Sequence, residues 1–209
     1  MTKIKKISKS VRKGFNKFWF LLWGDDSLKG WIFSIVFLFV FIKFLFFPAL
    51  GLITGTSLPM AIVESCSMYH QEQSFFNFNS WWESENPKYA NFNISKQDFD
   101  LFRGGLRKGD IIFIVKARPE KVKLGDVIIF DAGQRNPLIH RVVNIKQENG
   151  KYIFSTFGDN NDQQLSVEKE ISEDQLVGKP VAIIGPYLGW AKLVFFEAQR
   201  PDYEKGFCK

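Results

Sequence analysis

The sequence predicts a mainly β domain that is tethered to a membrane by one N-terminal helix. An apolar segment long enough to cross a bilayer lies near the N-terminus, and positive charge collects before it. Short β-branched or aromatic runs, separated by turn residues, then fill the second half of the chain. A length of 209 residues suits one globular domain of about 150 residues with an attached segment.

The first 30 residues form a basic amphipathic segment. Apolar residues recur at spacings of three and four from Ile4 to Phe18, with Lys and Arg between them, which predicts a helix with one apolar face. An aromatic cluster at 19–23 precedes the apolar segment, so we expect this helix to lie in the membrane interface on the cytoplasmic side. A solvated helix on a soluble domain is the alternative.

Residues 31–54 are predicted to form a transmembrane helix. Their length matches the roughly 20 residues that a bilayer requires, and it exceeds the roughly 7–15 apolar residues of a cleaved signal peptide, which is the alternative. The excess of Lys and Arg before the span predicts a cytoplasmic N-terminus, so the chain should cross the cell membrane once. Lys43 lies near mid-span, where a lysine costs about 3 kcal/mol, so it should snorkel or face an acidic partner helix.

Residues 55–200 are predicted to form an extracytoplasmic β domain, followed by a tail at 201–209. An aromatic-rich insertion at 71–105 should contain a helix near 80–88 and a second short helix capped by Ser95. Its aromatic side chains could pack on the core or rest on the bilayer surface. The strand spacing predicts a mostly antiparallel barrel or packed sheets. The expected strands are 61–63, 111–115, 126–131, 138–145, 151–157 and 180–185.

Charge and cysteine content exclude some kinds of site. Eight basic and two acidic residues lie within residues 1–30, whereas the remaining residues contain 20 of each and are neutral. A neutral domain lacks the basic face of a nucleic-acid-binding protein, so no nucleic-acid partner is expected. The chain has only two cysteines, Cys66 and Cys208, and we expect neither a metal nor a cofactor. The two could form one bridge, but free thiols are expected, because nothing else in the sequence ties the tail to Cys66.

The run AIVESCSMYH at 61–70 carries the candidate nucleophile. It reads as a short strand that ends in a polar turn containing Ser67. A serine hydroxyl attacks a carbonyl only if a base removes its proton and donors stabilise the resulting oxyanion. The chain has two histidines that could act as the base. His70 is too close in sequence to Ser67 to be well oriented, whereas His140 lies in a distant predicted strand.

The residues alone leave two features of the site open. The turn GDNND supplies two acids, Asp159 and Asp162, although an Asp in a turn more often shapes the turn. Cys66 could replace Ser67 as the nucleophile that faces His140. Adjacent residues of an extended turn point in opposite directions, so only one of the two can face the base.

Six short motifs follow one another in a specific order along most of residues 60–190. They are S-x-S-M at 65–68, K-G-D at 108–110, G-D-V-I-x-F at 125–130, I-H-R-V at 139–142, G-D-N-N at 158–161 and V-G-K at 177–179. In this order they resemble signal peptidase I, most closely the archaeal and endoplasmic-reticulum branch, the Sec11 type of peptidase family S26. The resemblance implies the β fold that signal peptidases share with LexA-like proteins.

The resemblance implies a role for each site residue. Ser67 would be the nucleophile, and His140 stands where the bacterial branch has its lysine base. An acid of the GDNND turn would orient His140, with Asp162 as the first choice and Asp159 as the second. The hydroxyl of Ser65 would join the backbone N–H of Ser67 in stabilising the oxyanion.

The chain also departs from the family pattern. Tyr69 and His70 follow the S-x-S-M motif where a proline is usual, and Phe157 replaces a frequent lysine before GDNN. The gap between the first two motifs is longer than usual. The family places its second acid farther beyond GDNN than Asp162.

The implied function is a membrane-bound serine endopeptidase that removes signal peptides from exported preproteins by a Ser-His-Asp mechanism. Its partners would be those preproteins, the lipid bilayer and, as a candidate, the protein translocation channel. The alternative is a catalytically inactive, membrane-anchored β scaffold. That alternative predicts that Ser67, His140 and the turn acids do not converge in space.

Overall fold

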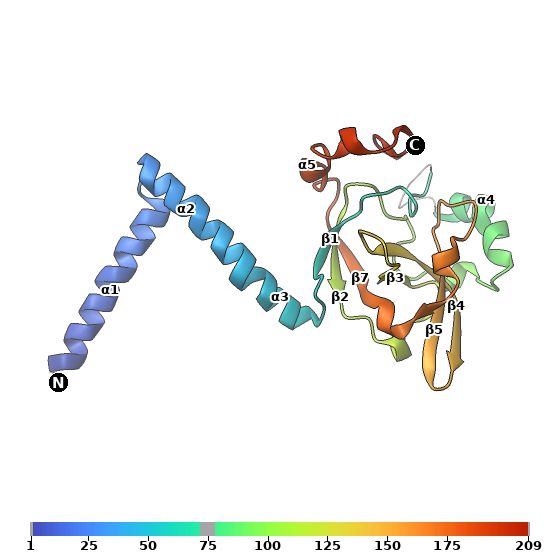
Figure 1. Ribbon diagram of the computed structural model, residues 1–209, viewed down its shortest axis with the longest axis horizontal. Coiled ribbons are helices and arrows are strands. Elements are labelled where there is room, and N and C mark those ends of the chain that lie inside the picture. The colour runs from blue at the N-terminus through green and yellow to red at the C-terminus, as the bar shows by residue number, and fades with distance from the viewer. Residues whose placement is uncertain (1, 72–77, 209) are drawn as a thin grey trace. The chain divides into compact units, whose positions relative to one another are not determined.

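The chain divides into two compact units, residues 1–53 and residues 54–209 (Figure 1). The computed structural model describes residues 2–71 and 78–208, with the backbone alone described at residues 2–11 and 203. Within this described part, the first unit is helical and the second unit contains every strand.

The first unit begins with the basic helix α1 (Thr2–Trp23), which matches the helix predicted over this segment. Ser27 caps the next helix, because its side chain accepts a hydrogen bond from the backbone N–H of Gly30 at 3.2 Å. Phe18 of α1 packs edge-on against Phe37 of that helix, with ring centroids 5.1 Å apart. The interfacial location of α1 stays a prediction.

A long apolar helix follows, at the position predicted for the membrane span. In the described chain it is the one helix with the length and composition to cross a membrane, and it runs for 27 residues. Pro48 has no backbone N–H, and its ring would clash with the carbonyl four residues earlier, so the helix widens into a π turn just before it. Its segments are α2 (Leu28–Phe41), the π turn (Ile42–Phe46) and α3 (Phe47–Thr54).

The second unit is built on one seven-stranded sheet with the strand order β1-β2-β7-β3-β4-β5-β6. All neighbouring strands are antiparallel, and register shifts interrupt the β2–β7, β3–β7 and β4–β5 pairings, where they bend the strands. The strands are β1 (Met60–Ile62), β2 (Ile111–Val115), β3 (Val127–Phe130), β4 (Leu138–Glu148), β5 (Lys151–Phe157), β6 (Ile171–Ser172) and β7 (Leu176–Gly185). The predicted fold class, a mainly β domain with one N-terminal apolar helix of spanning length, is confirmed.

Short helices connect the strands and form the C-terminal end of the described chain. They are α4 (Phe78–Ala90), α5 (Trp190–Leu193) and the 3₁₀ turns η2 (Lys96–Asp98), η3 (Pro119–Lys121), η4 (Ser166–Glu168), η5 (Glu173–Gln175), η6 (Glu197–Gln199) and η7 (Asp202–Glu204). The helix expected near 80–88 is α4, and the helix expected after Ser95 is η2.

The aromatic insertion packs on the sheet. Its side chains form a buried cluster with Phe157 at the end of β5, and both Phe99 and Tyr89 of this cluster are fully buried. The rings of Tyr89 and Phe157 meet edge-on, with centroids 5.9 Å apart. Of the two positions left open by the sequence, packing on the core is the one observed for these residues. The insertion therefore covers the end of the sheet next to the GDNND turn.

Strand β3 is buried on both faces. Val127 and Ile129 belong to one apolar cluster, which includes β2 and the turn after β1. Ile128 and Phe130 belong to another cluster, with Val142 of β4. Since successive side chains of a strand point to opposite faces, β3 lies in the core and fixes the position of β4 beside it.

Candidate active site

The turn after β1 carries Ser67 to the GDNND turn. The backbone N–H of Asn160 donates to the carbonyl of Ser67 at 2.8 Å, and the side-chain amide of Asn160 donates to the carbonyl of Cys66 at 3.1 Å. Just before the turn, Val63 exchanges backbone hydrogen bonds with Gly109 and Asp110 at 2.8 and 2.9 Å. The turn at residues 65–67, hereafter the nucleophile turn, is thus held by two segments that are distant in sequence.

His140 lies on β4, opposite Ile128 of β3, and its side chain is buried. Its Nε2 atom is 2.9 Å from the Oγ atom of Ser67. Its Nδ1 atom contacts the carboxylate of Glu168. Because a carboxylate accepts hydrogen bonds, these partners assign the proton to Nδ1 and leave the lone pair of Nε2 facing the serine hydroxyl.

Glu168 is fully buried at the end of η4. Its Oε2 atom accepts from the backbone N–H of Leu165 at 2.7 Å, and its Oε1 atom accepts from the hydroxyl of Thr156 at 3.2 Å. Glu168 was not among the acids expected from the sequence. The signal in the sequence was spacing. The family has more residues between GDNN and its second acid, and Glu168 lies well beyond Asp162.

Neither acid expected beside His140 contacts it in the described residues, so the expected placement of Asp162 and Asp159 is corrected. Asp162 is exposed at the surface of its turn. Asp159 is fully buried, but its carboxylate is turned toward Arg141, which donates to it from Nη2 at 2.6 Å and from Nε at 2.9 Å. The physical reason is that the buried guanidinium needs a counter-charge, and Asp159 supplies it.

Asp159 also accepts hydrogen bonds from Tyr89 and His70. The Tyr89 hydroxyl lies 2.7 Å from Oδ1, and the Nε2 atom of His70 lies 2.8 Å from Oδ2. Burial by itself would raise the pKa of Asp159, but the charge of Arg141 and the hydrogen bonds from His70 and Arg141 outweigh burial and hold the pKa well below its ordinary value. His70 thus serves this buried ion pair, and it stacks on Trp81 with ring centroids 3.5 Å apart.

Ser65 lies beside Ser67. Its hydroxyl oxygen is 3.1 Å from the Oγ atom of Ser67, and its side chain is exposed. The backbone N–H of Ser67 makes no hydrogen bond to another residue that the structure describes. Both groups can therefore donate to an oxygen that is placed next to Ser67 Oγ.

Gly158 allows the close approach of the GDNND turn to His140. A Cβ atom at this position would lie 2.9 Å from Nε2 of His140 and 2.5 Å from the side-chain amide nitrogen of Asn161. Any side chain at 158 would therefore collide with the ring of His140. Within residues 2–71 and 78–208, no cluster of three or more His, Cys, Asp or Glu side chains is arranged to hold a metal ion.

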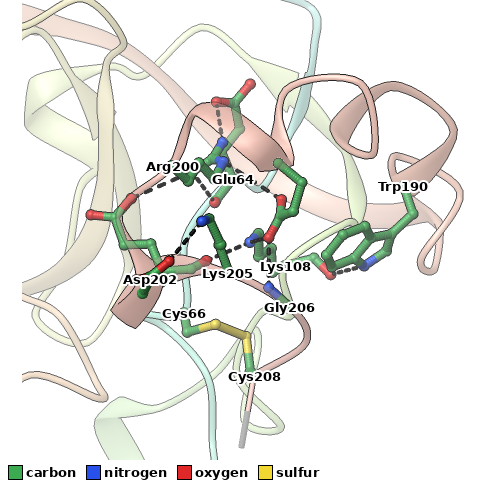
Figure 2. A network of polar contacts seen from close by, with 11 residues as sticks. Glu64, Cys66, Lys108, Trp190, Arg200, Asp202, Lys205, Gly206 and Cys208 are labelled. Carbon is green, nitrogen blue, oxygen red and sulfur yellow. Dashed lines mark hydrogen bonds and ion pairs between the residues drawn. A yellow bond between two sulfur atoms is a disulfide. The ribbon is translucent and has the colours of Figure 1, made fainter.

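Cys66 and Cys208 form a disulfide, with Cα atoms 5.5 Å apart (Figure 2). The expectation of free thiols is therefore wrong. The C-terminal segment folds back onto the nucleophile turn through contacts between residues far apart in sequence, such as Arg200 with Glu64 at 2.9 Å. A cysteine in a disulfide has no thiolate, so the reading of Cys66 as a nucleophile is also corrected.

Comparison with known proteins agrees with the motif order. The chain is 29% identical over 103 residues to the signal peptidase complex catalytic subunit SEC11C of Homo sapiens, covering 46% of this chain and 53% of that protein. It is 33% identical over 98 residues to the catalytic subunit SEC11 of Scheffersomyces stipitis, covering 44% of this chain and 58% of that protein.

A third relative is the SEC11 catalytic subunit of Lodderomyces elongisporus. It is 31% identical to this chain over 100 residues, covering 44% of this chain and 59% of that protein. The chain spans a little over half the length of the curated relatives that it matches. No protein-family model matches it. The resemblance to Sec11-type signal peptidases, first indicated by six short motifs, is nevertheless confirmed by these named relatives.

Proposed function

We propose that this chain is a membrane-bound serine endopeptidase that removes signal peptides from exported preproteins. The observation that carries the proposal is the 2.9 Å separation between Ser67 Oγ and His140 Nε2, with a buried carboxylate on the opposite ring nitrogen. A histidine held in this way can accept and return a proton near neutral pH. The relatives' names, catalytic subunits of the signal peptidase complex, support the same reaction.

The first step is attack by Ser67 on the scissile carbonyl. The hydroxyl proton passes to Nε2 of His140 as Oγ bonds to the carbonyl carbon. Glu168 takes the role expected of Asp162 or Asp159, because its carboxylate accepts from Nδ1 and stabilises the imidazolium that forms. No proton moves to Glu168 in this step.

The oxyanion is stabilised beside the nucleophile. In the resting site the Ser65 hydroxyl lies 3.1 Å from Ser67 Oγ, and after attack it is free to turn toward the new oxyanion. The backbone N–H of Ser67 is the second donor. One such donor contributes about 3 kcal/mol to the transition state.

The intermediate then collapses. His140 gives its proton to the leaving amine, which departs as the mature N-terminus, and the signal peptide stays on Ser67 as an ester. A water molecule attacks the ester with His140 again acting as the base, and Ser67 is regenerated. The family resemblance implies small residues at the first and third positions before the cut.

The membrane anchor determines which substrates reach the site. A single span with a cytoplasmic N-terminus would hold the β domain at the outer surface of the cell membrane, where a cleavage site emerges while its apolar segment stays in lipid. Exported preproteins and the bilayer are the partners in this proposal, and the protein translocation channel is a candidate partner.

The test compares wild type with Ser67→Ala and His140→Ala in liposomes that contain a preprotein. We expect both substitutions to abolish cleavage while the circular dichroism of the domain is unchanged. The inactive-scaffold alternative predicts that Ser67 and His140 are apart, so their proximity supports the peptidase. If wild type cleaves no preprotein of a varied set, or Ser67→Ala cleaves as fast as wild type, the proposal fails and the scaffold takes its place.

A further inference from the structure

The C-terminal segment from α5 to Cys208 is bound to Glu64 and Cys66, which precede Ser67 in the chain (Figure 2). At Glu64, which precedes the turn, the guanidinium of Arg200 donates to the backbone carbonyl at 3.0 Å and to the carboxylate at 2.9 Å. Lys192 forms a second ion pair with the same carboxylate at 3.2 Å. The C-terminal segment therefore binds the chain at Glu64, three residues before Ser67.

Lys108 binds the same C-terminal segment through its side chain. Its side chain is buried, and its Nζ atom donates to Glu197 and to the carbonyl of Glu204, both at 2.6 Å. Glu197 also accepts from the backbone N–H of Gly206 at 2.6 Å, and the ring of Trp190 lies 5.0 Å from Nζ. An unpaired buried ammonium is costly, so these contacts strongly specify where the segment lies.

The disulfide adds a covalent link directly beside Ser67, the proposed nucleophile. Cys66 precedes Ser67, and its partner Cys208 lies 142 residues away along the chain. Asn160 also holds the turn, through hydrogen bonds to the carbonyls of Cys66 and Ser67. Both cysteines are partly exposed, so a small dithiol can reach them.

We infer that the C-terminal segment positions Ser67, and that this positioning depends on oxidation of Cys66 and Cys208 to the disulfide. The inference rests on the proposed function. In the oxidising step the two thiols lose two electrons and two protons to a disulfide-bearing oxidant, which becomes a dithiol. A dithiol reductant reverses the step. The site would therefore reach full activity only after its domain enters an oxidising compartment.

The test measures cleavage of a preprotein by the full chain in liposomes, before and after reduction with dithiothreitol. We expect kcat to fall about tenfold with little change in KM, since a displaced nucleophile impairs the chemical step more than binding. The double variant Cys66→Ser/Cys208→Ser should show the reduced rate and no response to dithiothreitol. Lys205→Ala is the matched control, because its ion pair with Asp202 is exposed and lies within the tail.

Hydrogen exchange of the same samples separates this inference from the proposed function. Reduction should speed the exchange of amides in residues 64–68 and leave those of β4 protected. If wild type cleaves nothing, the proposed function fails, and this exchange pattern alone decides whether the segment orders the turn. Equal kcat and equal exchange in the oxidised and reduced chains would overturn the inference. It would also be overturned if β4 lost protection, because the disulfide would then stabilise the whole domain rather than the turn.

Discussion

His140 and Arg141 are neighbours on β4, yet each meets a different buried acid. His140 contacts Glu168, whereas Arg141 binds Asp159. Successive side chains of a strand point to opposite faces, so one acid cannot serve both residues. The I-H-R-V motif therefore sends one side chain to the proposed chemistry and the other to the ion pair that fixes the GDNND turn.

This division predicts that Glu168→Gln inactivates the proposed peptidase. An amide can donate to Nδ1 of His140 and hold the wrong tautomer, which removes the base from the serine. In a comparable triad such a change lowers kcat by roughly 10⁴-fold, and we expect a loss of that order. The measurement is kcat for preprotein cleavage, with circular dichroism to verify folding.

Asp162→Asn is the control for that substitution. Its side chain is exposed and has no contact with His140 in the described residues, so kcat should change less than about twofold. A large loss in Asp162→Asn, together with normal cleavage by Glu168→Gln, would return the orienting role to the GDNND turn.

Ser65→Ala tests the oxyanion donor. Its hydroxyl lies 3.1 Å from Ser67 Oγ, so its loss removes one donor from the transition state and leaves the base in place. We expect kcat to fall by about 10²–10³ with KM nearly unchanged, which corresponds to roughly 3 kcal/mol. Ser65→Thr keeps a hydroxyl and should recover much of the rate. If Ser65→Ala cleaves normally, the oxyanion is stabilised by other groups.

Local patterns predicted much of the β domain. Alternating residues and turn glycines placed six of the seven described strands within four residues of their observed bounds, because both signals act over short distances. Strand β6 has only two residues, too few to show a period. The π turn before Pro48 was not predicted, since a helix can accommodate a proline in several ways.

From the sequence, site residues could be predicted only where they lie within the ordered motifs. Ser67 and His140 were singled out from the sequence, and the fold brings them together. Glu168 was missed because its burial depends on how the loop after β5 folds back over Thr156. The disulfide was missed because the return of the C-terminal segment depends on Lys108 and Glu197, which lie 89 residues apart.

The Asp159–Arg141 pair predicts a pH-dependent stability. The pKa of Asp159 is held well below its ordinary value of 3.8 in the folded protein. A group with a lowered pKa stabilises the fold above the pKa of the unfolded chain, and this stabilisation is lost as the pH falls toward the folded value. We expect the free energy of unfolding, measured in urea, to decrease as the pH falls below 3.8.

Asp159→Asn should remove much of that acid dependence. At neutral pH it should also lower the free energy of unfolding by about 3–5 kcal/mol, because it leaves Arg141 buried without a counter-charge. Asp162→Asn should keep the acid dependence of wild type. An equally steep loss of stability at low pH in Asp159→Asn would show that other carboxylates control acid unfolding.

Tyr89→Phe isolates the contribution of the aromatic insertion to the same ion pair. The phenol donates to Asp159 at 2.7 Å, and burial, followed by the charge of Asp159, raises the pKa of Tyr89 well above its ordinary value, so it stays a neutral donor. Loss of a hydrogen bond to a charged group costs about 1.5–3 kcal/mol, and we expect urea unfolding to report that decrease. Tyr152→Phe is the matched control, because the side-chain partner described for Tyr152 is Glu173, which it reaches through its backbone N–H and not its hydroxyl, and the substitution should change stability by less than about 0.5 kcal/mol. If the two substitutions cost the same, the insertion contributes apolar packing on Phe157 but no electrostatic support to Asp159.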